Sequence, residues 1–253
     1  VSARQQQDAA LTEHIRAVQQ QGRGLYGSDR IHQALRHRGI ATSRKRVARL
    51  MRENGLNSRR QPSWKPSTTD SRHHRPVAPN LLRRDFSADA PNEKWLGDIV
   101  GIWTDEGWLY LAALLDCFSR TIVGWAMDAT RDEKLVEDAL LMALKQRQIT
   151  PHQGLIHHTD RGSQYTADDY QALLASGGIA VSMSGKGDPY DNAMMESFFA
   201  TLRAELTELQ RFATRRVAEL AIFEYIEVFY NRQRIHTSIG YTHPTAYEAH
   251  HYL

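Results

Sequence analysis

The sequence has 253 residues, enough for one large domain and one small one. Its hydrophobic content of 41% and charged content of 24% are ordinary for a globular protein. No signal peptide is visible, and no apolar run approaches the roughly eighteen residues that a membrane span requires, so we expect no membrane association. The single cysteine, Cys117, excludes an internal disulfide and a cysteine-based zinc finger, and it suits a reducing, cytoplasmic compartment.

The net charge of +3 conceals an uneven distribution of charge along the chain. Residues 1–94 contain 19 Lys and Arg against 8 Asp and Glu, whereas residues 95–253 contain 13 against 21. A basic block beside an acidic one is typical of a nucleic-acid anchor joined to a metal-using active site. A solvated basic tail on an acidic domain is the alternative explanation.

The basic region begins with a predicted helix over residues 5–20, followed by two shorter helices. Ser28 and Ser43 are the expected N-caps of these two helices, and Gly39 and Gly55 are expected to end them. Two short helices with a tight connection, the second strongly basic, match a helix-turn-helix, although a helical hairpin with solvated arginines gives the same pattern. The predicted DNA-binding residues of the second helix are Arg44, Lys45, Arg46, Arg49 and Arg52.

Periodicity is lost after these helices, where prolines, Ser, Thr, Arg and His predict a basic, extended linker. This linker either lies along a DNA backbone or is flexible. We therefore expect three parts: a helical domain over residues 1–56, a linker over 57–90 and a larger domain over 91–253.

The larger domain begins with two apolar runs, 94–104 and 108–116, separated by the turn Asp105-Glu106-Gly107. A third strand follows, and then helices and strands alternate before two longer helices. This order predicts an RNase H-like α/β fold, with a mixed sheet flanked by helices. The further elements are predicted at 121–127, 133–146, 155–159, 167–175, 179–182, 193–208 and 214–230.

Asp98 lies in the middle of a strand that is apolar on both faces, so the strand is expected to be central and buried. A buried, unpaired carboxylate is unfavourable by several kcal/mol, so a cation, a basic side chain or protonation must compensate. No Lys or Arg occurs between Lys94 and Arg120, which favours a metal ion over a local salt bridge.

Asp160 and Glu196 are the carboxylates that we expect to join Asp98. Asp160 ends a predicted strand, and carboxyl ends of strands are where α/β sheets place ligands. Glu196 flanks the apolar stripe of the following helix at its first turn. Three carboxylates suit two Mg²⁺ ions held roughly 3.5–4 Å apart for phosphodiester chemistry, with Mn²⁺ as a substitute. The adjacent residues His157 and His158 face opposite ways on a strand and cannot share a zinc site, and Asp116 is expected to be a turn residue or an outer neighbour.

The spacing of Asp98, Asp160, 35 intervening residues and Glu196 resembles the DDE signature of retroviral integrases and transposases. The segments WLGDIVGI, LAALLDCFSR, HHTDRGSQY, GDPYDNAMMESFFATLRAEL and YNRQRIHTSIGYTHP are similar to the second-frame (OrfB) product of bacterial insertion sequences of the IS-three group. The stretch YGSDRIHQALRHRGIATSRKRVARLMRENGL resembles the inner helix-turn-helix of that group. The resemblance therefore spans nearly the whole chain.

This resemblance implies an integrase core and a DNA transposase that cuts 3′ ends and transfers strands by a copy-out, paste-in route. Its metal ligands and catalytic residues would be Asp98, Asp160 and Glu196. Tyr230, Asn231, Arg234 and His236 match a C-terminal signature with an expected role in packing or DNA-backbone contact. Further DNA contacts are expected from Ser163, Gln164, Tyr165, Asn192, Arg203 and Arg234. One departure is visible, because many relatives have Thr-Asp where this chain has Gly97-Asp98.

The resemblance also implies the partners of the chain. They are double-stranded DNA, as terminal inverted repeats and as target, and further copies of the chain, as a dimer or a larger assembly on paired ends. An upstream-frame (OrfA) product or fusion is a further expected partner, and the expected location is the bacterial cytoplasm at the nucleoid. The alternatives are a DNA-binding regulator with an inactive RNase H-like domain and a metal-dependent nuclease that joins no strands.

Overall fold

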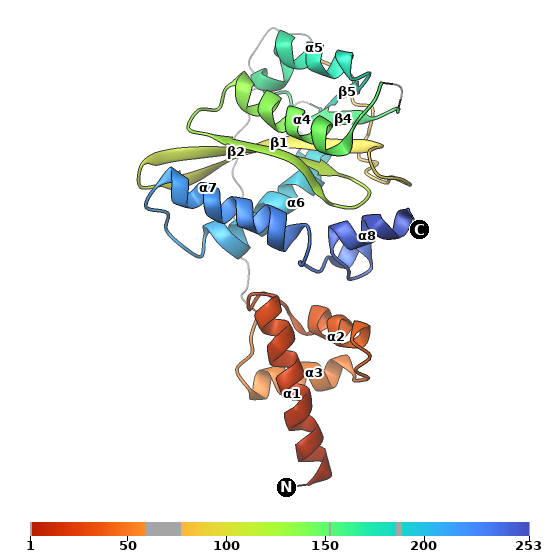
Figure 1. The fold of residues 1–253 in the computed structure, drawn as a ribbon, viewed down its shortest axis with the longest axis vertical. Helices are drawn as coiled ribbons and strands as arrows, with labels where there is room; N and C mark the ends of the chain where they lie inside the picture. The colour runs from red at the N-terminus through yellow and green to blue at the C-terminus, as the bar shows by residue number, and fades with distance from the viewer. Residues whose placement is uncertain (1, 59–76, 152, 186–188, 253) are drawn as a thin grey trace.

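The computed structural model of the chain describes residues 2–58, 77–151, 153–185 and 189–252. Its N-terminal part is a bundle of three helices, which packs below a larger α/β part in Figure 1. The helices are α1 (Ala3–Gln21), α2 (Ser28–His37) and α3 (Arg44–Glu53).

The ends of α2 and α3 largely follow the predicted caps. Ser43 caps α3 by accepting a hydrogen bond from the Arg46 amide at 3.2 Å. Gly39 and Gly55 follow the two helices with φ of +74° and +66°, a left-handed conformation that glycine adopts without a steric penalty. The prediction for Ser28 is wrong. The extended residue before it takes the N-cap position, so Ser28 is the first helical residue.

A mixed sheet of five strands forms the centre of the larger part, in the order β3-β2-β1-β4-β5. The central strand β1 pairs antiparallel with β2 and parallel with β4, as expected for a strand that is apolar on both faces. The predicted hairpin joins β1 to β2. The strands are β1 (Lys94–Thr104), β2 (Gly107–Asp116), β3 (Ile122–Asp128), β4 (Ile156–Thr159) and β5 (Ala180–Met183).

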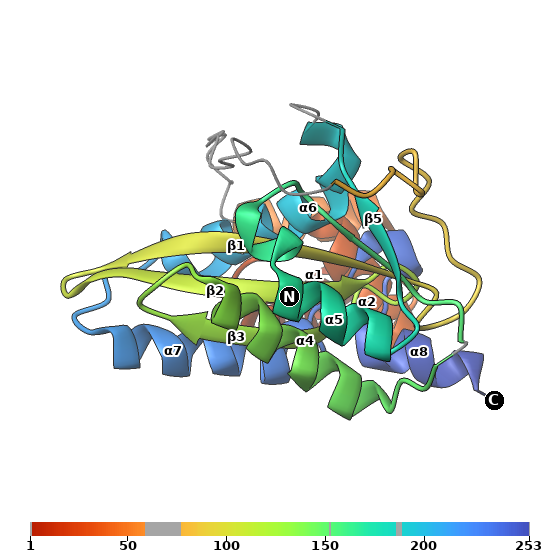
Figure 2. The ribbon, with the colours of Figure 1, turned by 90° about the horizontal axis from the view of Figure 1, so that it is seen from above.

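Helices cover both faces of this sheet, as Figures 1 and 2 show. On one face, α4 (Glu133–Arg147) and α5 (Asp168–Ser176) enclose a core built around Trp95 and Tyr170. On the other face lie α6 (Ala193–Leu202) and α7 (Arg215–Glu224).

The two predicted long helices have the expected extent, but both finish in π-helical turns, η3 (Arg203–Thr207) and η4 (Tyr225–Tyr230). Four shorter elements are not predicted by the sequence patterns. They are η1 (Ser163–Thr166), η2 (Pro189–Asn192), η5 (Thr237–Ile239) and α8 (Pro244–His251).

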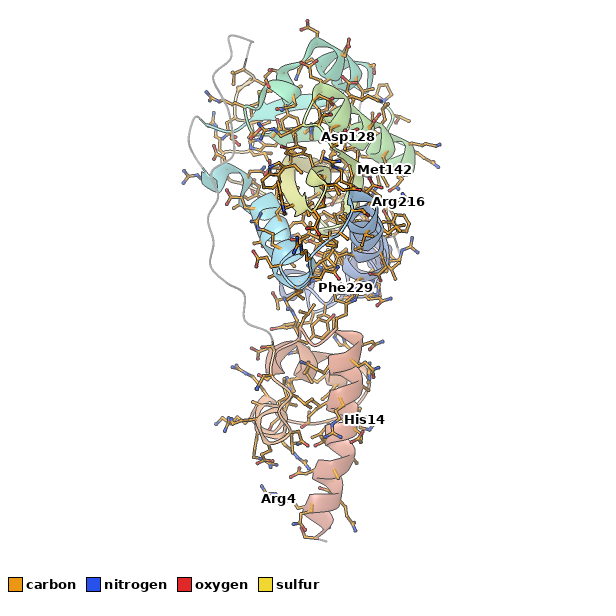
Figure 3. All side chains as sticks on the ribbon, turned by 90° about the vertical axis from the view of Figure 1, so that its left-hand side faces the viewer. Arg4, His14, Asp128, Met142, Arg216 and Phe229 are labelled. Carbon is orange, nitrogen blue, oxygen red and sulfur yellow. The ribbon has the colours of Figure 1, made fainter. Side chains whose placement is uncertain are left out.

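The N-terminal bundle contacts the larger part at the C-terminal end of η4. The Tyr26 hydroxyl accepts a hydrogen bond from the Ile235 amide at 2.9 Å and donates one to the Gln233 carbonyl at 3.3 Å. Arg23 forms an ion pair with Glu224, and its guanidinium lies over the Phe229 ring. Buried side chains of the bundle are continuous with the core under α6 and α7 (Figure 3).

The predicted linker falls partly outside the described residues, because 59–76 are not described. Its later part packs against the α/β part. Leu82 is buried, the Leu81 amide donates to Ser182 Oγ at 2.9 Å, and Asn80 donates to Asp191 at 3.0 Å. Among the described helices, none is long and apolar enough to cross a membrane.

Candidate active site

Asp98 and Asp160 come together through the parallel pairing of two strands. Residues 94–96 of β1 pair with 156–158 of β4, and continuing this register by two residues places Asp98 opposite Asp160. Adjacent strands lie roughly 4.8 Å apart, so two carboxylates 62 positions apart in sequence become direct neighbours.

Each of these carboxylates is oriented by a backbone amide. The Ile99 amide donates to Asp98 Oδ1 at 2.7 Å, and the Gly162 amide donates to Asp160 Oδ1 at 2.8 Å. A Cβ at residue 162 would lie 3.0 Å from this same Asp160 oxygen, so a side chain there would crowd the carboxylate. Small backbone donors therefore fix one oxygen of each aspartate.

Asn192 ties the start of α6 to the strand that carries Asp98. Its Nδ2 donates to the Gly97 carbonyl at 3.3 Å, and it is the N-cap residue of α6. Glu196 lies in the first turn of this helix, on an exposed face. The Oδ1 atom of Asn192 is buried and has no hydrogen-bond partner among the described residues, so it is an acceptor open to a donor or cation.

Asp160 and Glu196 both act electrostatically on Asp98. Burial raises the pKa of Asp98 well above its usual value, and the negative charges of Asp160 and then Glu196 raise it further. The charge of Arg131 lowers the same pKa and opposes these effects. Arg131 precedes α4 in a polar turn, and no local sequence pattern connects it with Asp98.

Among the residues that the structure describes, no three His, Cys, Asp or Glu side chains form a ready-made metal cage. Like charges at short range repel and separate. Mg²⁺ commonly uses one or two protein carboxylates, with waters and substrate phosphates as its other ligands. The donor set is therefore chemically suited to Mg²⁺ and would be completed by a bound phosphate.

The loop after Asp160 divides into exposed and buried residues. Ser163 is exposed, and the side-chain amide of Gln164 donates to the Arg131 carbonyl at 2.9 Å. Tyr165, by contrast, is buried, with its ring edge-on to Tyr170 at 5.6 Å between centroids. Burial and the nearby charge of Asp98 raise the pKa of Tyr165 well above its usual value. Of the three expected DNA contacts in this loop, Ser163 is the most accessible.

The basic residues of α3 also fall into two groups. Arg46 and Arg49 turn toward α1 and form ion pairs with Asp8 at 2.6 and 2.7 Å. Their charges are partly neutralised within the bundle, a role that the sequence analysis did not foresee. The exposed basic residues of α3 are Arg44, Lys45 and Arg52.

Arg203 and Arg234 have different environments. Arg203 is half-buried at the beginning of η3, two helical turns beyond Glu196. Arg234 is buried, and its Nε and Nη2 both donate to the Glu205 carboxylate at 2.7 Å. Of the two roles expected for the C-terminal signature, these contacts support packing for Arg234.

Asn231 of the same signature is also a packing residue. Its side chain exchanges two hydrogen bonds with the backbone of Ile122 on β3, at 2.9 and 3.0 Å.

The histidines of β4 face opposite sides of the sheet, as expected. His157 bonds the Tyr170 hydroxyl at 2.7 Å, whereas His158 bonds Ser182 at 2.7 Å.

Two further carboxylates near the site have structural partners. Asp116 is fully buried and accepts hydrogen bonds in the turn after β2, as expected. Asp191 accepts from the Gly185 amide at 2.7 Å and forms an ion pair with Arg84 at 3.4 Å. Asp188, which lies near Glu196 in the sequence, is outside the described residues.

Comparisons with protein-family models agree with this architecture. Two models described as integrase core domain match residues 88–189 and 177–244, and a model described as HTH-like domain matches residues 5–63. A chain of the simian T-cell lymphotropic virus intasome shares the fold, with a TM-score of 0.50 and 15% identity over 86% of this chain and 70% of that chain. The fold and the carboxylate site thus define an integrase-core enzyme of the DDE polynucleotidyl transferase superfamily, with an HTH-like N-terminal domain.

Curated relatives narrow this class. The chain is 44% identical over 247 residues to the transposase for insertion sequence element IS904 of Lactococcus lactis, covering 98% of this chain and 96% of that protein. It is 44% identical to the 31 kDa protein of insertion element IS600 of Shigella sonnei, over 97% of this chain and 89% of that protein. Identity to transposase InsF of insertion sequence IS3A of Escherichia coli is 40%, over 98% and 85% of the two chains. The chain belongs to the IS3 family of insertion-sequence transposases.

Proposed function

We propose that the chain cuts DNA at the 3′ ends of an insertion sequence and transfers these ends to new DNA, with Asp98, Asp160 and Glu196 as ligands of divalent metal ions. The observation that carries the proposal is that Asp98 is buried beside Asp160, opposite it in the continued register of β1 and β4: burial raises the pKa of Asp98, and the charges of Asp160 and Glu196 raise it further. Side chains that destabilise one another in this way are characteristic of a site that is completed by a cation.

Two features support Mg²⁺ at this position. All three side chains supply hard oxygen ligands, and the buried Oδ1 of Asn192 adds an acceptor without a partner beside the same strand. The chemistry supplied by bound Mg²⁺ is activation of the attacking water or 3′-hydroxyl and stabilisation of the leaving oxygen. Mn²⁺, which also accepts oxygen ligands, is the expected substitute.

The residues of the chain then have defined tasks. Asp98 and Asp160 hold their carboxylates in fixed orientations through the amides of Ile99 and Gly162. Glu196, on an exposed face of α6, adjusts by rotation of its side chain. Asn192 sets the position of that helix against β1. Activity requires Asp98 in its deprotonated form, because a protonated carboxyl is a poor ligand.

DNA is the substrate that we expect to bind beside the carboxylates and the metal ions. Ser163 is exposed three residues after Asp160, Arg203 lies two helical turns beyond Glu196, and the exposed basic residues of α3 belong to the N-terminal bundle. We expect at least two copies of the chain to act together, since two element ends must be cut and joined in one reaction. We expect an upstream-frame partner or fusion to contribute to end recognition, and the reaction to take place on the bacterial chromosome.

The direct test uses the purified chain and a labelled duplex that carries the element end, with and without Mg²⁺. Nicking and strand joining are scored separately for Asp98→Asn, Asp160→Asn and Glu196→Gln. The matched control is Asp138→Asn, which removes an exposed carboxylate of α4 that pairs with Lys134. We expect each site variant to lose about a thousandfold or more in joining while DNA binding persists, and the control to retain activity.

Other outcomes identify the alternatives. Nicking without joining in the wild type indicates a metal-dependent nuclease. Binding without either reaction indicates a regulator, unless joining returns when the upstream-frame product is added. Retention of joining in any of the three site variants contradicts the assigned ligands.

A further inference from the structure

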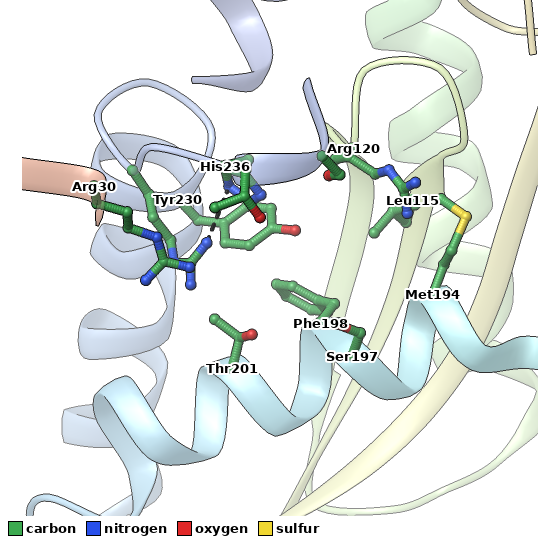
Figure 4. Close-up of a pocket in the computed structure, with 12 residues that line it drawn as sticks. Arg30, Leu115, Arg120, Met194, Ser197, Phe198, Thr201, Tyr230 and His236 are labelled. Carbon is green, nitrogen blue, oxygen red and sulfur yellow. Dashed lines mark hydrogen bonds between the residues drawn. The ribbon is translucent and has the colours of Figure 1, made fainter. Parts of the chain in front are cut away.

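A second site lies where the N-terminal bundle meets the catalytic helix α6. It is a pocket of about 240 Å³, shown in Figure 4, with α6 as its floor. Three arginines from distant parts of the sequence line it: Arg30 of α2, Arg120 of the turn after β2, and Arg234. Hydroxyl groups of Ser197 and Thr201, the residues one and five positions after Glu196, also line it. The pocket thus combines cations with neutral hydrogen-bond donors.

The positive charge in this pocket exceeds the negative charge. Arg234 is paired with Glu205 by two hydrogen bonds, as described above. Arg30 and Arg120 form no ion pair with any carboxylate of the described residues. The Nε atoms of both are buried, and neither has a hydrogen-bond partner in the described part of the chain. Two cationic donors therefore lack acceptors, although buried polar groups are nearly always paired.

Arg30 and Arg234, which both line the pocket, interact electrostatically. Burial lowers the pKa of Arg30, and the charge of Arg234 lowers it further. His236, which also lines the pocket, has its pKa lowered to about 2 by burial and by the charges of Arg234 and Arg30. His236 is therefore neutral at physiological pH, and the arginines carry the charge.

Arg120 has an unfavourable backbone conformation. Its φ of +67° lies in the left-handed region, which glycine and asparagine adopt far more readily than arginine. A residue held in such a conformation is often kept for function rather than for stability. The Arg120 side chain in this turn supplies a cation to the pocket.

We propose that this pocket binds one phosphate of the DNA backbone, with Arg30 and Arg120 as its charged donors and Ser197 and Thr201 as hydroxyl donors. Arginine suits this ligand because its planar fork of N–H groups matches phosphate oxygens. A phosphate bound here contacts the HTH-like domain through Arg30 and the catalytic helix through Ser197. DNA binding would thereby hold the two parts of the chain together next to Glu196. This inference rests on the proposed function, because it takes DNA as the substrate.

The test is the salt dependence of binding to a random-sequence duplex of about 30 base pairs, without divalent metal. Each phosphate contact contributes about 0.9 to the slope of log Kd against log salt, and the contribution does not depend on sequence. We expect Arg30→Gln and Arg120→Gln each to reduce the slope, by about 0.9 in the double variant because the two share one phosphate, and Arg30→Lys and Arg120→Lys to restore it. Thr201→Val removes a neutral donor and is expected to weaken binding roughly three- to tenfold at an unchanged slope.

The matched control is Arg216→Gln on α7, an exposed arginine that is not among the lining residues and pairs with Glu219. It should leave the slope unchanged. Slopes in the two glutamine variants equal to that of the wild type, with normal thermal unfolding, overturn the pocket proposal and leave the transposase proposal standing. A wild-type chain that binds no duplex overturns both.

A parallel titration with inorganic phosphate distinguishes a site for a DNA phosphate from a site for a free phosphate ion. If phosphate raises the Tm of the wild type but not of the Arg30→Gln, Arg120→Gln double variant, while the DNA slopes of the two remain equal, the pocket is a site for a free anion. That result also overturns the proposal. The proposal is supported if the slope of log Kd against log salt for DNA falls in the glutamine variants and returns in the lysine variants.

Discussion

Asp98 and Asp116 lie on neighbouring strands of one sheet, and burial raises the pKa of both, yet their surroundings differ. Asp116 receives hydrogen bonds on both oxygens, including those from the Asn92 amide at 2.7 Å and the Phe118 amide at 2.9 Å. Asp98 receives one from its neighbour Ile99 and is repelled by two other carboxylates.

Asp116 and Asp98 represent two different uses of a buried charge. Around Asp116, the protein supplies the partners itself, so the carboxylate organises a turn. Around Asp98, partners are incomplete, and in the proposed function a metal ion completes the arrangement. The arginine pocket on α6 also contains buried groups with incomplete hydrogen-bond partners, but their charge is positive. Asp98 and Asp116 are both buried, so the number of hydrogen-bond partners, rather than burial, is what differs between them.

The largest effect on stability is expected from Asp116→Asn. The new amide group would face N–H donors that now bond a carboxylate oxygen, so at least one donor from the set Asn92, Trp95, Phe118 and Ser119 loses its acceptor. We expect the free energy of unfolding to fall by about 2–4 kcal/mol, measured by urea denaturation. Asp138→Asn on the exposed face of α4 is the control, and an equal effect in both would refute the structural role of Asp116.

A smaller loss is expected from a substitution at Gly97. A Cβ at Gly97 would lie 2.8 Å from Cε1 of His157, whose ring is buried and bonded to Tyr170. Gly97→Thr should therefore destabilise the chain by about 1–3 kcal/mol, and His157→Ala should recover part of the loss in a double-mutant cycle.

Gly101→Thr on the same strand is the matched control for this substitution. Gly101 is exposed, and a Cβ there would meet the Trp108 side chain, which is 47% exposed and has room to move. If Gly101→Thr and Gly97→Thr have the same effect on urea denaturation, the His157 ring is not the reason for glycine at position 97.

Much of this architecture is predictable from sequence because it depends on local patterns. The succession of strands and helices along the chain, the hairpin after Thr104 and the caps at Ser43 and Gly55 follow from alternation, turn residues and helix-end chemistry. The carboxylate spacing, together with its flanking motifs, identifies Asp98, Asp160 and Glu196 as candidates. Their proximity, however, depends on the register between β1 and β4, which no local pattern contains.

Pairings between distant residues account for what the sequence did not reveal. The basic residues of α3 look equivalent in sequence, but Arg46 and Arg49 meet Asp8 from another helix. Arg30 and Arg120 are ninety positions apart and line one pocket only because the bundle docks beside α6. The error at Ser28 is of a different kind, since Gly27 and Ser28 are both acceptable N-caps and tertiary packing decides between them.

Asp98→Asn should stabilise the metal-free chain, in contrast to Asp116→Asn. The neutral amide removes the repulsion from Asp160 and Glu196 while it keeps an oxygen for the Ile99 amide. We expect the free energy of unfolding at about pH 8 to rise by on the order of 1 kcal/mol, with loss of strand joining. A decrease in stability would show that Asp98 has a structural partner and would remove the basis of the comparison.

The smallest effect concerns the pH dependence of stabilisation by Mg²⁺. Because the pKa of Asp98 in the folded chain is above its usual value of 3.8, its contribution to stability is fully present below pH 3.8 and is lost as the pH rises through the folded pKa. Mg²⁺ requires the deprotonated carboxylate, so it should restore stability where that contribution is lost. The rise in Tm caused by Mg²⁺ should therefore grow from about pH 5 to about pH 8.5 and reach a few degrees. In Asp98→Asn the rise should be smaller and nearly independent of pH. A wild-type rise that is constant over this range would mean that Mg²⁺ binds elsewhere, away from Asp98, whose charge Arg131 and the Ile99 amide compensate only in part.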